Sequence, residues 1–301
     1  SEGGVIDPNT NVGGSVNLDY EINSKQNIGF NYNLRYNKSF DSQISMFNSY
    51  NGILSNQSVQ NEDAQTRNHS FNLNYEIKTD SIGSKLSTNV SYLWYNRNSE
   101  SVSETFPINE GQYESFRQFV PQKINNIGAN VDYIWKTKNE NTWSFGGNYN
   151  YTETDNNTRR DDLTDGIFVN NFVLSNHFKY TENIIGFYAN YEKQFSEKFS
   201  GKLGLRYEIT QTDGDILGKD NSFTNDYANF LPFLSLNYAI NPTHNLSFSF
   251  SSRVRRPAFW ELNPSRMYFT PTNYIQNNPF MLSSKFYNSE LTYMYKGSYF
   301  L

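Results

Sequence analysis

Apolar and polar residues alternate along most of this chain. Residues 16–22 place Val, Leu, Tyr and Ile at every second position, and residues 28–36 repeat the pattern after a short polar stretch. A period of two brings alternate side chains to one face of a β-strand. The sequence therefore predicts strands that each have one apolar face. Eleven such runs lie at 16–22, 28–36, 71–77, 86–94, 127–135, 143–151, 185–191, 203–209, 234–240, 246–250 and 291–295, and a twelfth opens at 297–301.

The connections between these runs alternate strictly between short and long. Short polar turns are expected near 23–27, 78–84, 136–141, 193–199 and 241–245. Long links are expected near 38–67, 97–122, 152–171, 211–228 and 255–285. In an antiparallel meander every second connection lies at the same end, so all short turns share one end and all long loops the other. Outer-membrane β-barrels have this layout, with short periplasmic turns and long extracellular loops.

The ends of the apolar runs favour lipid as the neighbour of that face. Many runs end in Tyr or Trp, whose amphipathic rings suit the membrane interface. These residues are Tyr20, Tyr36, Tyr75, Trp94, Trp135, Trp143, Tyr151, Tyr191, Tyr207 and Tyr238. The opposite faces carry Asn, Ser, Thr, Lys, Glu and Gly, which suit a wet lumen. We predict an all-β, antiparallel meander of about 11–12 strands that is part of a transmembrane β-barrel. A soluble propeller or sandwich is the alternative, with the apolar face covered by another sheet.

Composition narrows the functional classes. Aromatic residues make up 17% of the 301 residues and charged residues 18%, and about one residue in seven is Asn. The net charge of -5 lacks the clustered basic residues that nucleic-acid binding needs, so no nucleic-acid partner is expected. The absence of cysteine excludes disulfides and thiolate chemistry and fits an exported protein. The mean hydropathy of -0.73 is expected when only one face of each strand meets lipid.

Candidate catalytic and metal-binding residues are sparse. His69, His177 and His244 are far apart in the chain and have no partners at the spacing of a metal site or a catalytic triad. We expect no catalytic residue, no bound metal, no cofactor and no enzyme activity. Two Asp-rich stretches, 161–166 and 213–226, lack the EF-hand spacing, so ordinary turns are the first interpretation and a loose calcium site the second.

The basic stretch Arg253-Val254-Arg255-Arg256-Pro257 follows the tenth run and opens the fifth long link. It is typical of a strand terminus, where Pro257 ends the ladder and the arginines face lumen water or headgroups. A role in attracting anions is the second interpretation. The aromatic residues Phe40, Phe47 and Tyr50 of the first long link suit either stacking on a ligand or packing of the loops.

From this stretch outward the sequence resembles the barrel of TonB-dependent outer-membrane receptors, in the subgroup called the outer-membrane protein β-barrel family. An ordered set of short motifs over roughly 178–295 carries the resemblance. The set comprises Tyr180-Thr181-Glu182-Asn183-Ile184, Gly204-Leu205-Arg206-Tyr207-Glu208-Ile209-Thr210, Leu231-Pro232-Phe233-Leu234-Ser235-Leu236, Ser252 to Pro257, Leu262-Asn263-Pro264 and Asn278-Pro279. Asn277 and Ser283-Ser284 stand where the family usually has Gly and Pro-Glu.

The resemblance implies that several motif residues are structural. They are Arg206, Glu208, Arg253, Arg256, Pro257, Asn263, Pro264, Asn278 and Pro279. It also implies a Gram-negative outer membrane, contact with its lipid, and energy supplied by TonB through an N-terminal plug domain. Family barrels have 22 strands around that plug. We therefore expect residues 1–301 to be a single internal barrel segment without the plug, which dimerises, needs detergent or refolds into a smaller closed barrel.

The leading functional hypothesis is uptake of a scarce nutrient, with a ferric siderophore, a cobalamin, a glycan or a peptide as ligand. A passive porin or surface adhesin is the second hypothesis, and a soluble β-rich binding module is the third. The sequence identifies no ligand-binding residue.

Overall fold

The structure is a computed structural model of the 301-residue chain, and it describes residues 2–6, 8–50, 53–108, 111–139, 141–217, 221–296 and 298–300. Strands dominate this part of the chain. They are β1 (Glu2–Ile6), β2 (Asn9–Asn23), β3 (Gln26–Tyr50), β4 (Ile53–Lys78), β5 (Lys85–Pro107), β6 (Glu114–Phe119), β7 (Gln122–Lys136), β8 (Thr142–Thr164), β9 (Ile167–Asn170), β10 (Asn176–Ser196), β11 (Phe199–Ile216), β12 (Asn221–Asn241), β13 (His244–Arg255), β14 (Met267–Tyr268), β15 (Tyr274–Ile275), β16 (Ser284–Tyr295) and β17 (Ser298–Phe300).

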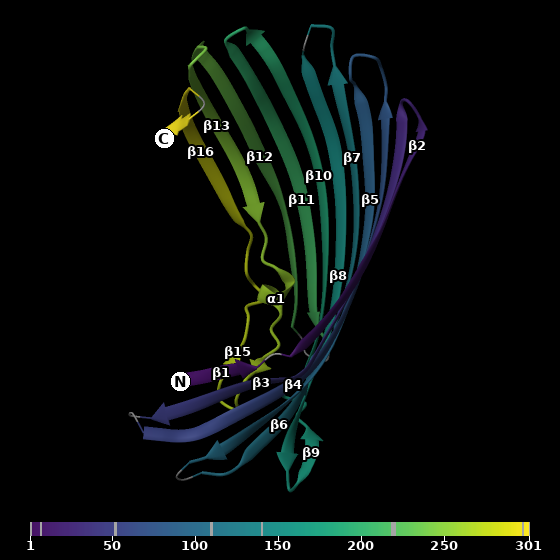
Figure 1. The fold of residues 1–301 in the computed structure, drawn as a ribbon. Coiled ribbons are helices and arrows are strands. Elements are labelled where there is room, and N and C mark those ends of the chain that lie inside the picture. Colours follow the sequence, from purple (N-terminus) through teal and green to yellow (C-terminus); the bar gives the residue numbers. More distant parts are fainter. Residues whose placement is uncertain are drawn as a thin grey trace.

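A single curved sheet of 15 strands forms the wall of the molecule (Figure 1). All pairs are antiparallel, as in the run from Phe178↔Ile216 to Ser196↔Phe199 between β10 and β11. The long strands follow one another in chain order, while β1 pairs with β3, and β6 and β7 both lie between β5 and β8. This arrangement satisfies the backbone groups of each inner strand from both sides, as hydrocarbon requires. The predicted all-β antiparallel meander is confirmed, and each of the eleven apolar runs falls within one wall strand.

The five short turns lie at one end of the wall, drawn at the top of Figure 1. The expected long links are mostly not loops, and this corrects the sequence interpretation. Residues 38–67 continue as β3 and β4, 25 and 26 residues long, and 152–171 continue as β8 and β9. Both faces of these extensions carry mostly polar residues. The alternation of apolar and polar residues that marks a half-buried strand is therefore lost, although strand pairing continues.

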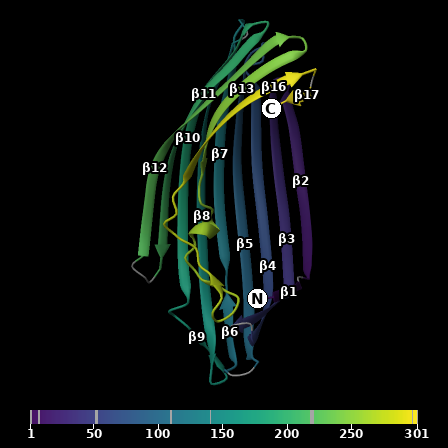
Figure 2. The same cartoon turned by 90° about the vertical axis from the view of Figure 1, so that its left-hand side faces the viewer.

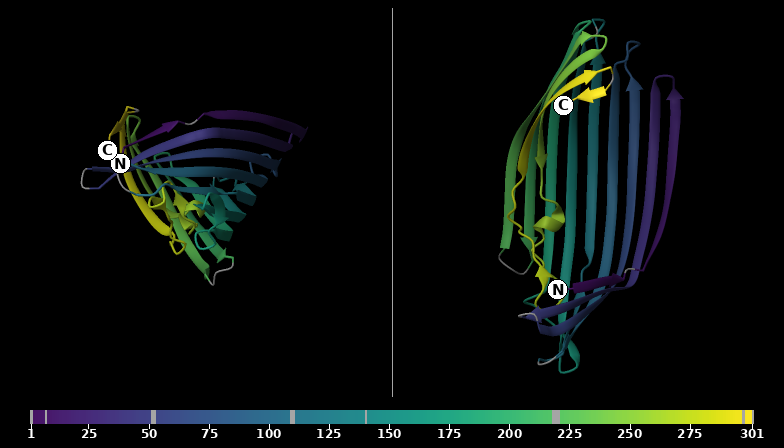
Figure 3. Two further views of the ribbon diagram at one scale, coloured as in Figure 1. Left: turned by 90° about the horizontal axis from the view of Figure 1, so that it is seen from below. Right: turned by 60° about the vertical axis from the view of Figure 1, so that its left-hand side comes forward.

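The two faces of the wall differ in chemistry. On β11, Leu203 and Leu205 are 60% and 48% exposed on the convex face. Glu208, Thr210 and Thr212 are buried and face the concave side, because successive side chains of a strand point to opposite faces. Figure 3 shows the concave side from below and from the side. The exposed apolar band on the convex side is the surface predicted to meet lipid.

One long connection remains irregular. Residues 256–283, between β13 and β16, turn back into the concave side of the wall, and we call them the luminal segment (Figures 1 and 2). The segment contains the four-residue helix α1 (Phe259–Leu262) and the small β14–β15 ladder. In the part of the chain described here, no helix has the length and apolar character that crossing a membrane requires.

Candidate functional site

The luminal segment begins at an ion-pair cluster on β11. Glu208 accepts from Arg206 at 2.6 Å through Oε1 and from Arg256 at 2.8 Å through Oε2. Arg256 also donates to Oγ1 of Thr210 at 3.0 Å. The Glu208 side chain is 9% exposed and that of Arg256 is 18% exposed. Buried charges of this kind are stable only when they are paired, so the cluster fixes the start of the segment on the wall.

An apolar contact holds the next part of the segment. Leu262 of α1 is buried with Phe178, Tyr180 and Ile216 of β10 and β11. Phe259 packs on this cluster, with its ring 5.8 Å from that of Phe178. Aromatic pairs at such distances add stabilisation beyond the area they bury. This cluster is the main apolar core inside the described wall.

Amide and hydroxyl side chains of the wall then bind the backbone around β14. Gln118 donates to the carbonyl of Arg266 at 2.8 Å, and Gln60 donates to the carbonyl of Tyr268 at 3.0 Å. Ser103 donates to the carbonyl of Phe269 at 3.1 Å. These wall residues come from β6, β4 and β5, and all three are buried. The short helix and ladder satisfy part of the segment's backbone, and the wall supplies partners for these three carbonyls.

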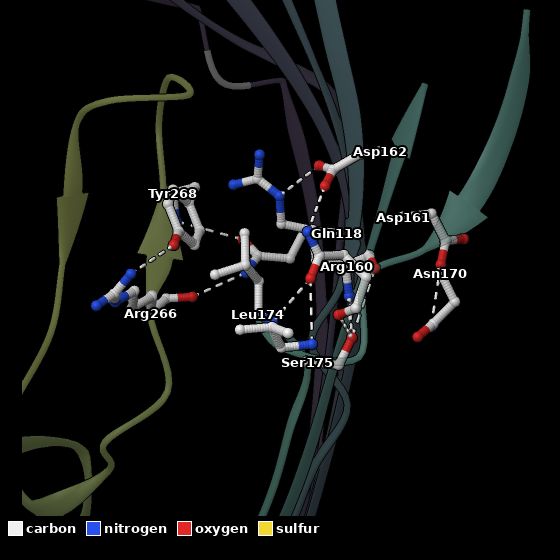
Figure 4. A network of polar contacts seen from close by, with 11 residues as sticks. Gln118, Arg160, Asp161, Asp162, Asn170, Leu174, Ser175, Arg266 and Tyr268 are labelled. Atoms are coloured by element: carbon white, nitrogen blue, oxygen red, sulfur yellow. Dashed lines mark hydrogen bonds and ion pairs between the residues drawn. The ribbon is translucent and has the colours of Figure 1, made fainter. Parts of the chain in front are cut away.

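Arg160 of β8 lies between the wall and the segment (Figure 4). Its guanidinium carbon stands 4.0 Å from the ring centroid of Phe116 and 4.2 Å from that of Tyr268. Asp162 accepts from its Nε at 2.7 Å. The two rings meet edge to face with their centroids 5.9 Å apart, so the guanidinium lies beside this pair and contacts both rings, and desolvation strengthens these cation–π contacts. Arg160 therefore clamps Tyr268 of the segment to Phe116 of the wall.

A second charged group lies on the opposite face of the same strands, well beyond the apolar band. Asp161 accepts both Nε and Nη2 of Arg159, at 2.7 and 2.6 Å, and Nη2 of Arg117 at 2.9 Å. The Arg159 guanidinium, followed by that of Arg117, holds the pKa of Asp161 below its usual value. Its carboxylate is committed to guanidinium groups. Among the described residues no cluster of His, Asp or Glu is arranged to hold a metal ion.

The segment keeps an exposed apolar surface despite these contacts. Trp260 is 64% exposed, Tyr274 is 40% exposed and Leu282 is 73% exposed. Arg266 lies 4.6 Å from the ring centroid of Tyr274 and donates to Gln276 at 3.0 Å. Rings beside fixed polar groups suit a ligand that offers both apolar faces and hydrogen-bonding atoms. This arrangement supports binding, and it contains no paired nucleophile and base.

The segment, its anchors and the polar concave face are thus parts of one barrel interior. The model of the outer membrane protein beta-barrel family matches residues 77–301, three quarters of the sequence. The chain belongs to the outer membrane protein β-barrel family. Its location is therefore the outer membrane, and its convex apolar band meets lipid. No curated protein sequence matches the chain.

Solved structures show the same fold at low sequence identity. The copper transporter OprC matches with a TM-score of 0.57 and 12% identity, over 97% of this chain and 51% of its own. FpvA of P. aeruginosa, in complex with a heterologous pyoverdine and iron, matches with a TM-score of 0.51 and 9% identity, over 97% and 46%. The unliganded ferric citrate transporter FecA matches with a TM-score of 0.50 and 12% identity, over 84% and 43%. The chain thus spans about half the length of these TonB-dependent receptor structures.

The structure unites some of the predicted motif residues and separates others. Arg206, Glu208 and Arg256 form one ion-pair cluster, and Asn263 donates to Asn156 of β8 at 3.3 Å. Arg253 lies on β13 outside that cluster and is exposed. Pro264, Asn278 and Pro279 lie within the luminal segment. The predicted strand end at Pro257 is confirmed, since β13 ends at Arg255. Arg256 is paired with Glu208 on the concave side, and its side chain is 18% exposed.

Other residues of the site gave no signal in the sequence. Gln60, Ser103 and Gln118 are isolated polar residues of polar strands, and Arg160 stood beside the Asp-rich stretch that was interpreted as a turn. Asp161 to Thr164 instead belong to strand β8, where Asp161 and Asp162 pair with arginines, whereas Asp165 and Gly166 form the expected turn before β9. In the second stretch Asp213 accepts from Thr224, whereas Asp220 lies outside the described residues. The three histidines lie apart, beside Tyr32, Asp155 and Tyr293.

Proposed function

We propose that the chain forms the wall and the ligand-contacting luminal segment of a receptor that imports a small nutrient, driven by TonB. The inward-folded luminal segment carries this proposal, because it presents the exposed rings of Trp260 and Tyr274 on the concave side of the wall, where a ligand would pass. The structures that share the fold are described as transporters of copper and ferric citrate and as a receptor bound to a pyoverdine, which supports transport as the activity.

The contacts of the luminal segment separate the residues that hold it in place from those that are available to a ligand. Wall residues such as Gln118 and Arg160 hold the segment, and the exposed rings of Trp260 and Tyr274 remain for the ligand. We propose that residues 1–301 form a single barrel segment. We also propose that TonB contacts the receptor through a plug domain. Ferric siderophores, cobalamins, glycans and peptides are the ligand classes considered, and none of the described residues is arranged for catalysis.

Uptake by living cells tests the proposal. A strain that lacks the gene is complemented with the wild-type gene, with Trp260→Ala, or with Trp135→Ala. Trp135 is the matched control, because it is 46% exposed on the convex face of β7. Depletion of siderophores, cobalamin, oligosaccharides and peptides from the medium is then followed by mass spectrometry, with TonB active or inactivated.

We expect one solute class to be taken up with the wild-type gene and the Trp135 variant, more slowly with Trp260→Ala, and not at all without TonB. Uptake that continues unchanged without TonB would identify a passive pore and reject the proposal. Equal rates in the two Trp variants would reject the role given to the luminal segment.

A further inference from the structure

A polar cavity lies at the end of the wall farthest from the short turns. Its volume is about 180 Å³, smaller than the roughly 300–1,000 Å³ typical of pockets for drug-sized ligands. It opens between the extended ends of β3, β4 and β5, the residues before β6, and the tip of the luminal segment. The lining residues are Asn48, Ser55, Asn56, Ser58, Thr105, Pro107, Gly111, Gln112, Glu114, Thr270, Pro271 and Thr272.

The chemistry of this lining is uniform. Amides and hydroxyls supply most of it, and among the described residues Glu114 is the single charged one. Each amide offers both a donor and an acceptor, and each hydroxyl offers both as well. No cationic side chain is found among the described lining residues, so a carboxylate, a phosphate or a catecholate would find no counter-charge from them. The lining matches a neutral ligand rich in hydroxyl groups.

The polar groups are held in place by their own contacts. Ser58 and Thr105 are 1% and 7% exposed, and their hydroxyl oxygens are 2.9 Å apart. Asn48 donates to Oδ1 of Asn56 at 2.7 Å. This bond leaves the carboxamide oxygen of Asn48 and the amino group of Asn56 for a ligand. Fixed hydrogen-bonding groups lose little freedom when a ligand binds, which favours affinity.

The cavity is also joined to the luminal segment. Thr270, Pro271 and Thr272 form one of its sides. The carbonyl of Phe269, immediately before them, accepts the hydroxyl of Ser103. The pyrrolidine rings of Pro107 and Pro271 add small apolar faces to the polar lining. A ligand bound here contacts both the outer hairpins and the segment that runs into the lumen.

We propose that this cavity binds one neutral sugar ring, so that the ligand class is an uncharged saccharide. The inference rests on the proposed transport function and narrows its substrate. A cavity of about 180 Å³ is too small for a ferric siderophore. Its described lining residues also offer no cation to pair with the carboxylate of a peptide.

Binding to the purified full-length receptor in detergent tests the inference. Calorimetric titrations use glucose, galactose, mannose, N-acetylglucosamine and their neutral trisaccharides, with glucuronate as the charged comparison. The variants are Asn56→Ala and Gln112→Ala. Asn74→Ala is the matched control, because Asn74 lies on the same strand and accepts from Asn89 at 2.7 Å, outside the cavity.

We expect at least one neutral saccharide to bind, glucuronate to bind more weakly, and each cavity variant to lose about tenfold in affinity, the value of one ligand hydrogen bond. Asn74→Ala should match the wild type. Absence of saccharide binding, or equal binding by Asn56→Ala and the wild type, overturns the inference. If TonB-dependent uptake of a charged solute accompanies that result, the proposed function stands and only the saccharide is rejected.

Discussion

Single residues decide where the luminal segment begins. Glu208 joins Arg206 of its own strand to Arg256 beyond the end of β13, and it does so with its side chain 9% exposed. Removing one partner from a buried charged group leaves the others desolvated and unpaired, which costs more than the hydrogen bond itself. The position of Arg256 thus depends on a carboxylate 48 residues earlier in the chain.

Glu208→Gln should therefore loosen the segment without unfolding the wall. We expect its attachment to weaken by about 2–3 kcal/mol, because two guanidinium groups lose their charged acceptor. Limited proteolysis at residues 256–283 measures the effect. Glu192→Gln is the control, since Glu192 is 56% exposed and 3.7 Å from Lys202. Similar protection of the segment in both variants would contradict the anchoring role.

Asp161 gives a pH dependence at the outer ends of β6 and β8. Its pKa is lowered from 3.8 in the folded protein, so folding favours the charged form. The stabilisation is therefore complete above about pH 4 and is lost as the pH falls through the lowered pKa. A nitroxide on Thr164→Cys should become more mobile in this acid range. Asp161→Asn should remove most of that pH dependence, and a transition that persists in this variant belongs to another group.

At the scale of the strand, two neighbouring residues of β7 face different solvents. Val131 is 49% exposed on the convex face, and Asn130 is on the concave face. Val131→Lys should destabilise the folded protein in vesicles by about 2–4 kcal/mol, because it puts a charge in the hydrocarbon. Asn130→Lys should change stability much less. Urea titrations in lipid vesicles compare the two, and equal costs would mean that the convex face does not meet lipid.

The sequence predicted the half of each strand that crosses the membrane and missed the other half. Alternation such as that of Leu203 and Leu205 with polar residues arises only where one face is apolar. Beyond the membrane both faces of β3 and β4 carry mostly polar residues, so the period vanishes although the ladder continues to Ser49↔Leu54 and Tyr50↔Ile53. The predicted loops became strands for this reason.

The site was harder to predict because it depends on long-range pairing. The Arg253–Pro257 stretch marked where the luminal segment starts. Its anchors are distant in sequence, by contrast. Gln60 donates to the carbonyl of Tyr268, 208 residues later, and Gln118 donates to that of Arg266, 148 residues later. Nothing local distinguishes these glutamines from other polar strand residues, since their role comes only from the register of the sheet.

At the scale of the whole molecule, the distribution of turns fixes its orientation. The short turns should face the periplasm and the extended hairpins the medium. The 301 residues contain no cysteine, so a single introduced cysteine is the one reactive thiol within them. A membrane-impermeant maleimide should label Ile167→Cys in intact cells, because Ile167 is 68% exposed in the β8–β9 hairpin. Glu197→Cys, in the turn between β10 and β11, should react only after lysis. The reverse pattern would invert the proposed topology.

The length of the wall strands has a consequence for what meets the cell first. With 26 residues at about 3.3 Å each, β4 has a contour of about 85 Å, whereas the apolar band of an outer-membrane barrel is about 25 Å tall. Most of its outer half therefore stands among the sugars that coat the bacterium. A macromolecule that approaches from the medium reaches these hairpin tips before it reaches the lumen. The polar cavity lies between these same tips, so a solute that arrives from the medium meets it before it enters the lumen.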